Sequence, residues 1–258
     1  TILKSARSEG FKTKEGREKA YEQLQKVNID ALVTIGGDGT FTGAQLFDEE
    51  YAFPIIGIPG TIDNDLYGTD HTLGYDSALN TAMNAIDNIR DTAASHDRLF
   101  FVEVMGRDVG FIALRCGIAG GAKAVLVPET KSDLSNLMNT LENCRKRNKT
   151  SMIVVVAEGD ETGGAFKIAD KVKEKFSYYD TRVSVIGHMQ RGGKPSCADR
   201  VLASRLGVGA VEALLNGEKG KMIGVIHRDL ALTSFDKTIK HHKEINREFL
   251  KLVNILSS

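Results

Sequence analysis

Short apolar runs rich in Val and Ile alternate with helix-length segments along the whole of this 258-residue sequence. The clearest runs are residues 53–58 and 151–157, and each is closely followed by a glycine and an acidic residue. Runs of this kind, alternating with helices, predict βαβ crossovers and parallel sheets whose strands are buried on both faces. We therefore expect an α/β fold, and the length allows one or two domains.

Apolar periodicity predicts the individual elements. We expect strands at residues 30–35, 53–58, 99–104, 124–127, 151–157, 182–186 and 222–226. We expect helices at residues 15–27, 41–50, 78–90, 109–119, 134–145, 166–176, 198–215 and 236–256. Because most of these strands end in a glycine near a charged residue, the candidate functional residues lie in the connections that follow the strands.

The composition is that of an ordinary globular chain, with 41% hydrophobic residues, 26% charged residues and a formal net charge of zero. That balance gives no reason to expect nucleic acid or a membrane surface as a partner, and no apolar run reaches the ~18 residues of a spanning helix. Cys116, Cys144 and Cys197 lack metal-ligand spacing, so we expect a reduced, cytoplasmic setting. The sequence opens at Thr1 without Met, and we expect further residues before it.

Two connections carry acidic residues that suit phosphate chemistry. Asp63 and Asp65 lie two positions apart on a turn that Gly60 can bend, just beyond an apolar run. In open α/β sheets ligands bind at the carboxyl ends of strands, and carboxylates there suit Mg²⁺ binding or proton abstraction. Residues 36–40, Gly-Gly-Asp-Gly-Thr, join a strand to a helix. Backbone N–H groups and the helix N-terminus can then face a phosphate, while Asp38 holds its metal.

Arginines accompany these connections, namely Arg7, Arg98, Arg107, Arg182 and Arg191. Phosphoryl transfer depends mainly on positioning and on neutralising the charge of the transferred group. More arginines than one triphosphate needs indicate that the acceptor is itself phosphorylated. The residues alone therefore predict a kinase that acts on a small phosphorylated metabolite.

Four blocks of sequence make a more specific pattern. They are residues 36–40, Pro-Gly-Thr-Ile-Asp-Asn-Asp at 59–65, Glu-Val-Met-Gly-Arg at 103–107 and Gly-His-Met-Gln-Arg-Gly-Gly at 187–193. In these blocks, and in their order across essentially the whole chain, the sequence resembles the ATP-dependent 6-phosphofructokinases. The resemblance implies transfer of the γ-phosphoryl group of ATP to the 1-hydroxyl of fructose 6-phosphate, giving fructose 1,6-bisphosphate and ADP.

The resemblance implies roles for the residues that match family motifs. Asp63 would be the base that takes the proton from the 1-hydroxyl, Asp38 would bind Mg²⁺, and Asp65 would support the metal or the phosphates. Arg107 would also stabilise charge in the transition state. The nucleotide would contact Arg7, Lys12, Gly37, Asp38, Gly39, Thr40 and Gly43. Fructose 6-phosphate would contact Thr61, Asp63, Met105, Gly106, Arg107, Glu158, His188 and Arg191.

Other matching residues concern assembly and regulation. In the family, arginines at the places of Arg98 and Arg182 reach the sugar phosphate of a neighbouring subunit, which implies a homotetramer. Basic residues of a bacterial effector site are matched by Arg90, Arg147 and Lys149, whereas Lys123 departs from the pattern of that site. Lys123 stands where the family usually has a glutamate that helps hold an effector-bound Mg²⁺. A lysine would repel that metal yet attract a bare phosphate, so we expect altered or weakened activation by ADP.

The resemblance also bears on the phosphoryl donor. ATP-dependent members have glycine after the metal-binding aspartate and before the Thr-Ile-Asp block, whereas pyrophosphate-dependent members have Asp and Lys there. This chain has Gly39 and Gly60 at the two places, which favours ATP.

The implied architecture is two similar three-layer α/β/α domains with mainly parallel, Rossmann-like sheets and the active site in the cleft between them. The larger, ATP-binding domain would take residues 1–74 and 190–240, and the smaller, sugar-phosphate-binding domain residues 75–189 and 241–258. The family opens with a strand and a Gly-rich phosphate loop, which we expect to precede Thr1.

Several alternatives stay open at this point. NAD kinases and lipid kinases also carry a Gly-Gly-Asp-Gly turn, although the blocks at 59–65 and 187–193 argue against them. A pyrophosphate-dependent phosphofructokinase would share the family, and a non-catalytic regulatory subunit would share the fold. A related acceptor, such as a sedoheptulose phosphate or tagatose 6-phosphate, is a further alternative.

Overall fold

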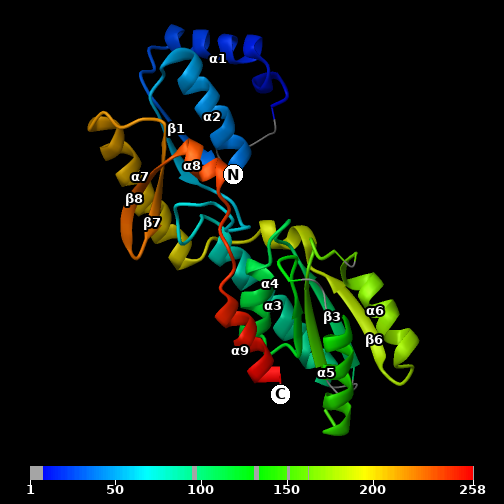
Figure 1. Ribbon diagram of the computed structural model, residues 1–258. Helices are drawn as coiled ribbons and strands as arrows, with labels where there is room; N and C mark the ends of the chain where they lie inside the picture. The colour runs from blue at the N-terminus through cyan, green and yellow to red at the C-terminus, as the bar shows by residue number, and fades with distance from the viewer. Residues whose placement is uncertain (1–7, 95–97, 131–133, 150–151, 162, 258) are drawn as a thin grey trace. The chain divides into compact units, whose positions relative to one another are not determined.

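The structure is a computed structural model that describes residues 8–94, 98–130, 134–149, 152–161 and 163–257. The chain folds into two compact units. Unit 1 comprises the residues up to Thr61 together with Leu66–Leu73 and Val201–His242. Unit 2 comprises Ile62–Asp65, Gly74–Arg200 and the residues from Lys243 onward. The chain therefore passes between the units several times (Figure 1).

Unit 1 contains a four-stranded sheet in the order β1-β2-β7-β8. Its strands are β1 (Leu32–Gly36), β2 (Ile55–Pro59), β7 (Lys221–Ile226) and β8 (Asp229–Ser234). The first three are parallel, and β7 and β8 form an antiparallel hairpin (Figure 1). Its helices are the 3-10 helix η1 (Gly10–Lys12), α1 (Lys14–Lys26), α2 (Asp38–Tyr51), α8 (Phe235–Lys240) and nearly all of α7 (Cys197–Leu215).

Helices pack on both faces of this sheet. On one face α2 and α8 meet through Phe41 and Phe235, whose rings stack with centroids 5.3 Å apart. On the other face α7 packs on the buried side chains of β2 and β7. Val33 and Ile35 of β1 belong to this second face, because they pair with residues of β2 that are buried under α7. Val33 and Ile35 are nevertheless 38% and 57% exposed. Within the described residues, α7 therefore covers the two central strands more completely than β1.

The turn between β7 and β8 is held by side chains rather than by favourable turn residues. His227 and Arg228 both have positive φ, at 50° and 78°, where hairpins usually place Asn-Gly. A residue with a β-carbon loses about 1–2 kcal/mol in this conformation. The N–H of His227 donates to Asp70 at 2.8 Å, and the guanidinium of Arg205 donates to the carbonyl of Arg228 at 2.5 Å. The sequence contains no local signal for this hairpin, and β8 is a strand that it does not predict.

Unit 2 contains a four-stranded sheet in the order β4-β5-β3-β6, with every pair parallel. Its strands are β3 (Arg98–Val104), β4 (Ala124–Leu126), β5 (Met152–Ala157) and β6 (Asp180–Val185). Its helices are α3 (Tyr75–Ala94), α4 (Phe111–Ala119), α5 (Leu134–Lys146), α6 (Gly164–Lys175), α9 (Arg247–Ser257) and the 3-10 helix η2 (Gly187–Arg191). The parallel α/β architecture expected from the sequence is confirmed.

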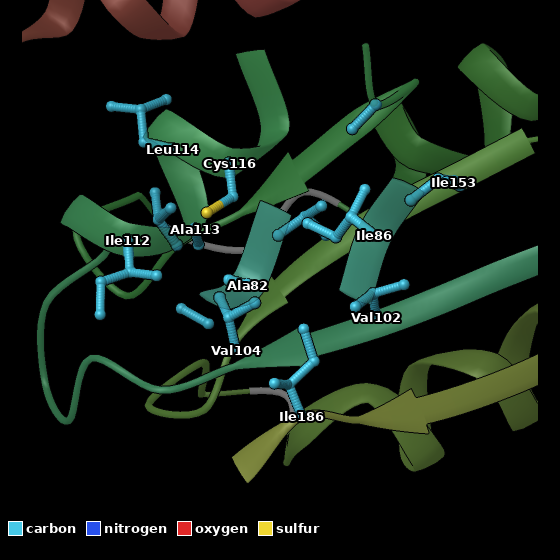
Figure 2. Packing of buried hydrophobic residues seen from close by; sticks show 14 of the residues in the cluster. Ala82, Ile86, Val102, Val104, Ile112, Ala113, Leu114, Cys116, Ile153 and Ile186 are labelled. Carbon is cyan, nitrogen blue, oxygen red and sulfur yellow. The ribbon is translucent and has the colours of Figure 1, made fainter. Parts of the chain in front are cut away.

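The core of unit 2 lies on both faces of its sheet, and β5 is buried along its whole length. Figure 2 shows one cluster, in which Ala82 and Ile86 of α3 and Cys116 of α4 gather with Val102 and Val104 of β3. The residues of β3 that alternate with these face α5 and α6 on the other face of the sheet. Fully burying one such aliphatic side chain contributes about 1.5–3 kcal/mol, which explains why these strands read as continuous apolar runs in the sequence.

Carboxylates from other elements cap helices of unit 2. Asp199 accepts hydrogen bonds from the backbone N–H groups of Gly74 at 3.1 Å and Ser77 at 2.9 Å, where α3 begins. Glu129 and Glu103 each accept a backbone N–H at the start of α4 and α6, both at 2.8 Å. A carboxylate in this position satisfies N–H groups that have no partner inside the helix and opposes the positive end of the macrodipole.

The helix expected at residues 236–256 is wrong, because the structure has two helices there, α8 and α9. Between them His242 forms an isolated antiparallel bridge with Leu66, and the N–H of Lys243 donates to the carbonyl of Asp65 at 3.3 Å. These tertiary hydrogen bonds replace the intrahelical ones, so the connecting segment leaves the helical conformation.

The expected domains, 1–74 with 190–240 and 75–189 with 241–258, differ slightly from the two units. Residues 190–200 belong to unit 2, since Asp199 caps α3 and the N–H of Ser196 donates to the Ser77 hydroxyl at 3.0 Å. The boundary therefore falls inside α7. The assignment of ATP to one domain and the sugar phosphate to the other stays a prediction.

Two expectations from composition can be compared with the structure. Within the described part of the chain, no helix has the length and apolar character needed to cross a membrane. Cys116, Cys144 and Cys197 are free thiols, of which only Cys197 is exposed. Burial raises the pKa of Cys116 to about 12, so this thiol stays protonated at neutral pH and packs as a small apolar side chain.

Asp199→Ala should destabilise unit 2, because the first turn of α3 loses an acceptor that receives two backbone N–H groups and the Ser77 hydroxyl. Loss of a capping side chain costs about 0.5–2 kcal/mol, and the burial of Asp199 places the effect at the upper end. Urea unfolding followed by circular dichroism measures the change, with Asp229→Ala at an exposed position of β8 as the control. A loss below ~0.5 kcal/mol, relative to that control, would contradict the capping role.

Candidate active site

The carboxyl ends of β1 and β2 lie side by side in unit 1. The two strands are parallel and pair in register up to Gly36 and Pro59. Beyond them the N–H of Gly60 donates to the carbonyl of Gly36 at 2.9 Å, and a β-carbon built on Gly37 would lie 3.7 Å from that of Thr61. The Gly-rich turn and Thr61 are therefore neighbours at the edge of the sheet where parallel α/β proteins bind ligands.

The Gly-rich turn leads directly into α2, which begins at Asp38 and not at residue 41 as the sequence predicts. Asp38 is half-buried, and Gly39 and Thr40 in the same first turn are exposed. A first helical turn has N–H groups without intrahelical partners and lies at the positive end of the macrodipole. This end of α2 can therefore bind an anion such as a phosphate, with the Asp38 carboxylate beside it.

Gly39 and Gly60 differ in the space around them. A β-carbon built on Gly39 would have no neighbour within 4 Å, so the described residues do not themselves require a glycine there. A β-carbon on Gly60 would lie 2.9 Å from the Ile35 side chain and 3.3 Å from the backbone nitrogen of Gly36. Packing therefore requires Gly60, whereas the space beside Gly39 is available to a ligand.

Lys12 and Gly43 are also expected at the nucleotide, while Arg7 lies outside the described residues. Lys12 is exposed, and its Nζ forms an ion pair with Glu9 at 2.9 Å. Gly43 is half-buried in the second turn of α2. Both residues therefore belong to the same unit as the Gly-rich turn.

Arg17 is a residue that sequence reasoning missed. It is 6% exposed and donates two hydrogen bonds to the Glu50 carboxylate, at 2.6 and 2.7 Å. Its Nη1 also donates to the carbonyls of Phe11 and Lys12, at 3.0 and 2.9 Å. The Phe11 ring would lie 3.3 Å from a β-carbon on Gly43. Arg17 therefore fixes the backbone that carries Lys12 against α2, through a partner too distant in sequence to give a local signal.

The loop that carries Asp63 follows β2, and residues Ile62–Asp65 belong to unit 2. Asp63 and Asn64 are buried, with 4% and 3% exposed, and Asp65 is half-buried. Asn64 has φ of 55°, a conformation that asparagine tolerates better than most residues. Asp63 is thus held in a largely dehydrated turn, and Asp65 is the more accessible of the two carboxylates.

Beyond the carboxyl end of β3, backbone N–H groups are gathered by a carboxylate. Met105 and Gly106 are buried, and Arg107 is exposed with φ of 54°. Oε1 of Glu158, which follows β5, accepts the N–H groups of Gly106 at 3.3 Å and Arg107 at 2.7 Å. Glu158 therefore holds the loop that presents the Arg107 side chain.

The third strand end at this edge is that of β6, which leads into η2. His188 and Arg191 are exposed on η2, whereas Gln190 between them is buried. The Gln190 side chain accepts the N–H of Met105 at 2.8 Å, and sequence reasoning did not select it as a site residue. Because β5, β3 and β6 are parallel neighbours, the expected sugar-phosphate residues after these three strands meet at one edge of the sheet.

Arg98 lies at the opposite, amino edge of the same sheet, and Arg182 lies in the first half of the neighbouring strand β6. Arg98 opens β3 and pairs in register with Asp180, and Arg182 lies two residues further along β6. Both guanidinium groups form ion pairs with the Asp180 carboxylate, at 2.9 and 3.0 Å. The hydrogen bond from Arg98, supported by Arg182, lowers the pKa of Asp180 below its ordinary value. The two arginines are together. Along β3, Arg98 lies about 20 Å from the last strand residue before the loop at Arg107, and Arg182, which pairs with Phe100, lies about 13 Å from it.

Basic residues expected at an effector site gather elsewhere in unit 2. Burial lowers the pKa of Lys123, and contact with the Lys149 ammonium and the charge of Arg147 lower it further. The Arg90 guanidinium lies beside Gly120 and Gly121, just before Lys123 in the sequence. A lysine whose charge is opposed by neighbouring cations favours an anionic ligand.

The residues present fit Mg²⁺ held together with a bound phosphate. Among the described residues, no group of three or more His, Cys, Asp or Glu side chains could hold a metal ion by itself. Mg²⁺ in kinase sites is commonly bound by one or two carboxylates, substrate phosphates and water. Asp38, at a helix end that can bind phosphate, supplies such a carboxylate.

Parallel α/β units with glycines, carboxylates and arginines at their strand ends suit phosphoryl transfer, and the comparisons with known proteins give the same class, the phosphotransferases. The sequence model of the phosphofructokinase family matches residues 1–214. The ATP-dependent 6-phosphofructokinase 2 of Bacteroides thetaiotaomicron is 51% identical over 257 residues, which cover 100% of this chain and 79% of that protein. The ATP-dependent 6-phosphofructokinase of Cytophaga hutchinsonii is 54% identical over 257 residues, covering 100% and 78%. The chain belongs to the phosphofructokinase family.

A solved structure agrees with this assignment. The phosphofructokinase of Saccharomyces cerevisiae matches with a TM-score of 0.87 and 35% sequence identity. The match covers 93% of this chain but 36% of the yeast chain, so this chain spans about a third of that protein. The fold expected from the sequence is confirmed by this likeness.

Proposed function

We propose that the chain transfers the γ-phosphoryl group of ATP to the 1-hydroxyl of fructose 6-phosphate, giving fructose 1,6-bisphosphate and ADP. Family membership and relatives named as ATP-dependent 6-phosphofructokinases support this reaction. The observation that carries the proposal is the meeting of Glu158, Arg107 and the His188–Arg191 turn at one sheet edge. A backbone loop fixed by a carboxylate and flanked by basic side chains suits a phosphorylated acceptor.

The nucleotide residues belong to unit 1. The first turn of α2 and its glycines face the ATP phosphates, with Lys12 and Gly43 nearby in the same unit. Mg²⁺ held by Asp38 and the phosphates would supply neutralisation of charge as the phosphoryl group moves. The space beside Gly39 leaves room for a ligand, and the choice of ATP over pyrophosphate rests on the glycines at positions 39 and 60, which match the ATP-dependent pattern.

The acceptor residues belong mainly to unit 2. Asp63 is the proposed base, because a carboxylate fixed in a buried turn can take the proton of the attacking hydroxyl. Asp65 supports the metal or phosphates, and Thr61 lies next to the Gly-rich turn. The sugar phosphate contacts Met105, Gly106, Arg107, Glu158, His188 and Arg191. Arg107 also stabilises the charge that develops in the transition state.

Two further proposals concern other copies and regulation. Arg98 and Arg182 serve the sugar phosphate of a neighbouring subunit in a homotetramer, which their place toward the amino edge supports. The cluster of Arg90, Lys123, Arg147 and Lys149 binds a phosphorylated effector such as ADP. We also keep the cytoplasm as the expected location.

Asp63→Asn should lower kcat by about 10²–10⁴-fold, the usual contribution of a general base. The amide cannot accept the hydroxyl proton, but it preserves the size of the side chain. A coupled assay measures phosphorylation of fructose 6-phosphate with ATP and with pyrophosphate side by side, and the melting temperature reports whether the variant is folded. Retained activity in a folded variant contradicts the role of Asp63. If the wild type turns over with pyrophosphate but not with ATP, pyrophosphate is the donor. If the wild type turns over with neither donor, the non-catalytic regulatory subunit is favoured.

Gly39→Asp should be tolerated by the fold and should strongly reduce the use of ATP. The new side chain meets no described neighbour, and an acid in the first turn of α2 stabilises the helix by about 0.5–1 kcal/mol. Its charge would face the nucleotide phosphates, and juxtaposed like charges cost several kcal/mol, so kcat/KM for ATP should fall by about 100-fold or more.

The matched control is Gly39→Ala, which adds a β-carbon without charge and should keep kcat/KM for ATP within a few-fold of wild type. An equal loss of kcat/KM for ATP in both variants would show that the size of the added side chain, and not its charge, lowers activity. Full ATP activity in Gly39→Asp would place the phosphates elsewhere.

ADP should activate the wild-type chain weakly at sub-saturating fructose 6-phosphate, because Lys123 and its cationic neighbours repel a metal bound to the effector. Lys123→Glu should introduce Mg²⁺-dependent activation, since a carboxylate is the oxygen ligand that Mg²⁺ prefers. Initial rates are titrated with ADP with and without excess Mg²⁺. Lys19→Glu on α1 makes the same charge change at an exposed position. Strong ADP activation of the wild type that Lys123→Glu leaves unchanged would contradict the expectation.

A further inference from the structure

Gln190 is a buried polar residue between two exposed residues proposed to bind the sugar phosphate. Only 2% of Gln190 is exposed, although His188 and Arg191 on the same short helix η2 face solvent. Its Oε1 accepts the N–H of Met105 at 2.8 Å. Met105 is the first residue after β3, so this hydrogen bond ties η2 to the loop that presents Arg107.

The orientation of the Gln190 amide follows from this bond. A backbone N–H can only donate, so the amide oxygen must face Met105 and the amide nitrogen must face away. Nε2 is buried and has no hydrogen-bond partner among the described residues. A buried N–H group without an acceptor costs about 1–3 kcal/mol, and native proteins rarely keep one. Among the described residues, Oε1 is therefore the atom through which this amide acts on the loop.

The loop that Gln190 holds has an unfavourable backbone conformation. Gly106 and Arg107 have φ of 154° and 54°, and the left-handed conformation costs a residue with a β-carbon about 1–2 kcal/mol. Such conformations persist only where surrounding contacts fix them. Glu158 fixes the N–H groups of Gly106 and Arg107, and Gln190 fixes the preceding N–H. Together the two side chains determine where the Arg107 guanidinium can reach.

We propose that Gln190 is a positioning residue of the acceptor site. Its Oε1 sets the loop 105–107 against η2, so that Arg107 and the exposed residues of η2 act as one group on the acceptor phosphate. This inference rests on the proposed function and extends it to a buried residue that acts on the acceptor through the loop it holds. A displacement of catalytic groups by about 1 Å can lower a rate 100-fold.

The test compares Gln190→Met with Gln190→Glu, both close in length to glutamine. Gln190→Met removes acceptor and donor, and KM for fructose 6-phosphate should rise by about 10–100-fold, with KM for ATP within twofold. Gln190→Glu keeps an acceptor for Met105 but replaces the donor with a charge that repels a phosphate. Its defect should shrink as the pH falls, because protonation of the new carboxyl removes that charge.

Hydrogen exchange at the Met105 amide supplies a readout that does not depend on turnover. Protection should be lost in Gln190→Met and kept in Gln190→Glu, because only the second retains the acceptor. Gln23→Met, at an exposed position of α1, is the matched control. Unchanged KM for fructose 6-phosphate in Gln190→Met overturns the inference. So does a parallel change of both KM values and the melting temperature, which would indicate a structural role alone.

Failure of the proposed function gives a different result. If the wild type does not phosphorylate fructose 6-phosphate with ATP, the reaction is wrong, and binding of inorganic phosphate measured by calorimetry replaces the kinetic comparison. Weaker phosphate binding and lost Met105 protection in Gln190→Met then still support the positioning role. Wild-type phosphate affinity with intact protection in that variant overturns it.

Discussion

Parallel, in-register pairing of neighbouring strands is the constraint on which the candidate residues of each unit depend. Pairing of Gly36 with Pro59 brings two strand ends together in unit 1, and β3 between β5 and β6 does so for three in unit 2. A slip of one residue would turn every side chain to the opposite face. It would also displace a strand end by about 3.3 Å. The burial that stabilises the sheets therefore fixes the site as well.

Carboxylates then complete what the strand ends begin. Asp199 and Glu103 cap helices, whereas Glu158 gathers the N–H groups of a strained loop. These groups use the same chemistry, a negatively charged acceptor for backbone donors, but only Glu158 lies beside residues proposed to bind substrate. Carboxylates that accept backbone N–H groups in this chain thus have two uses. Those that cap helices are structural, whereas Glu158 shapes the candidate site.

Local pattern predicts the parts of this chain that local physics determines. Buried runs such as residues 151–157 predict their strands, because burial on both faces demands apolar residues throughout. The helix expected at 236–256 is wrong because its interruption depends on partners far away in the chain, near Leu66. The roles of Arg17 and Gln190 escape prediction for the same reason, since Glu50 and Met105 are distant in sequence. The roles proposed for the individual site residues come from motif resemblance and stay predictions.

The two edges of the sheet in unit 2 carry different basic residues, and this separation limits how one chain can act. Arg107 follows the carboxyl end of β3, while Arg98 lies about 20 Å from that end and Arg182, which pairs with Phe100, about 13 Å from it. This length separates Arg98 from the proposed acceptor residues of its own unit. We therefore expect an acceptor phosphate bound by Arg98 and Arg182 to belong to another copy of the chain. That phosphate must also compete with Asp180, which now holds both guanidinium groups, so assembly and substrate binding would be coupled through this carboxylate.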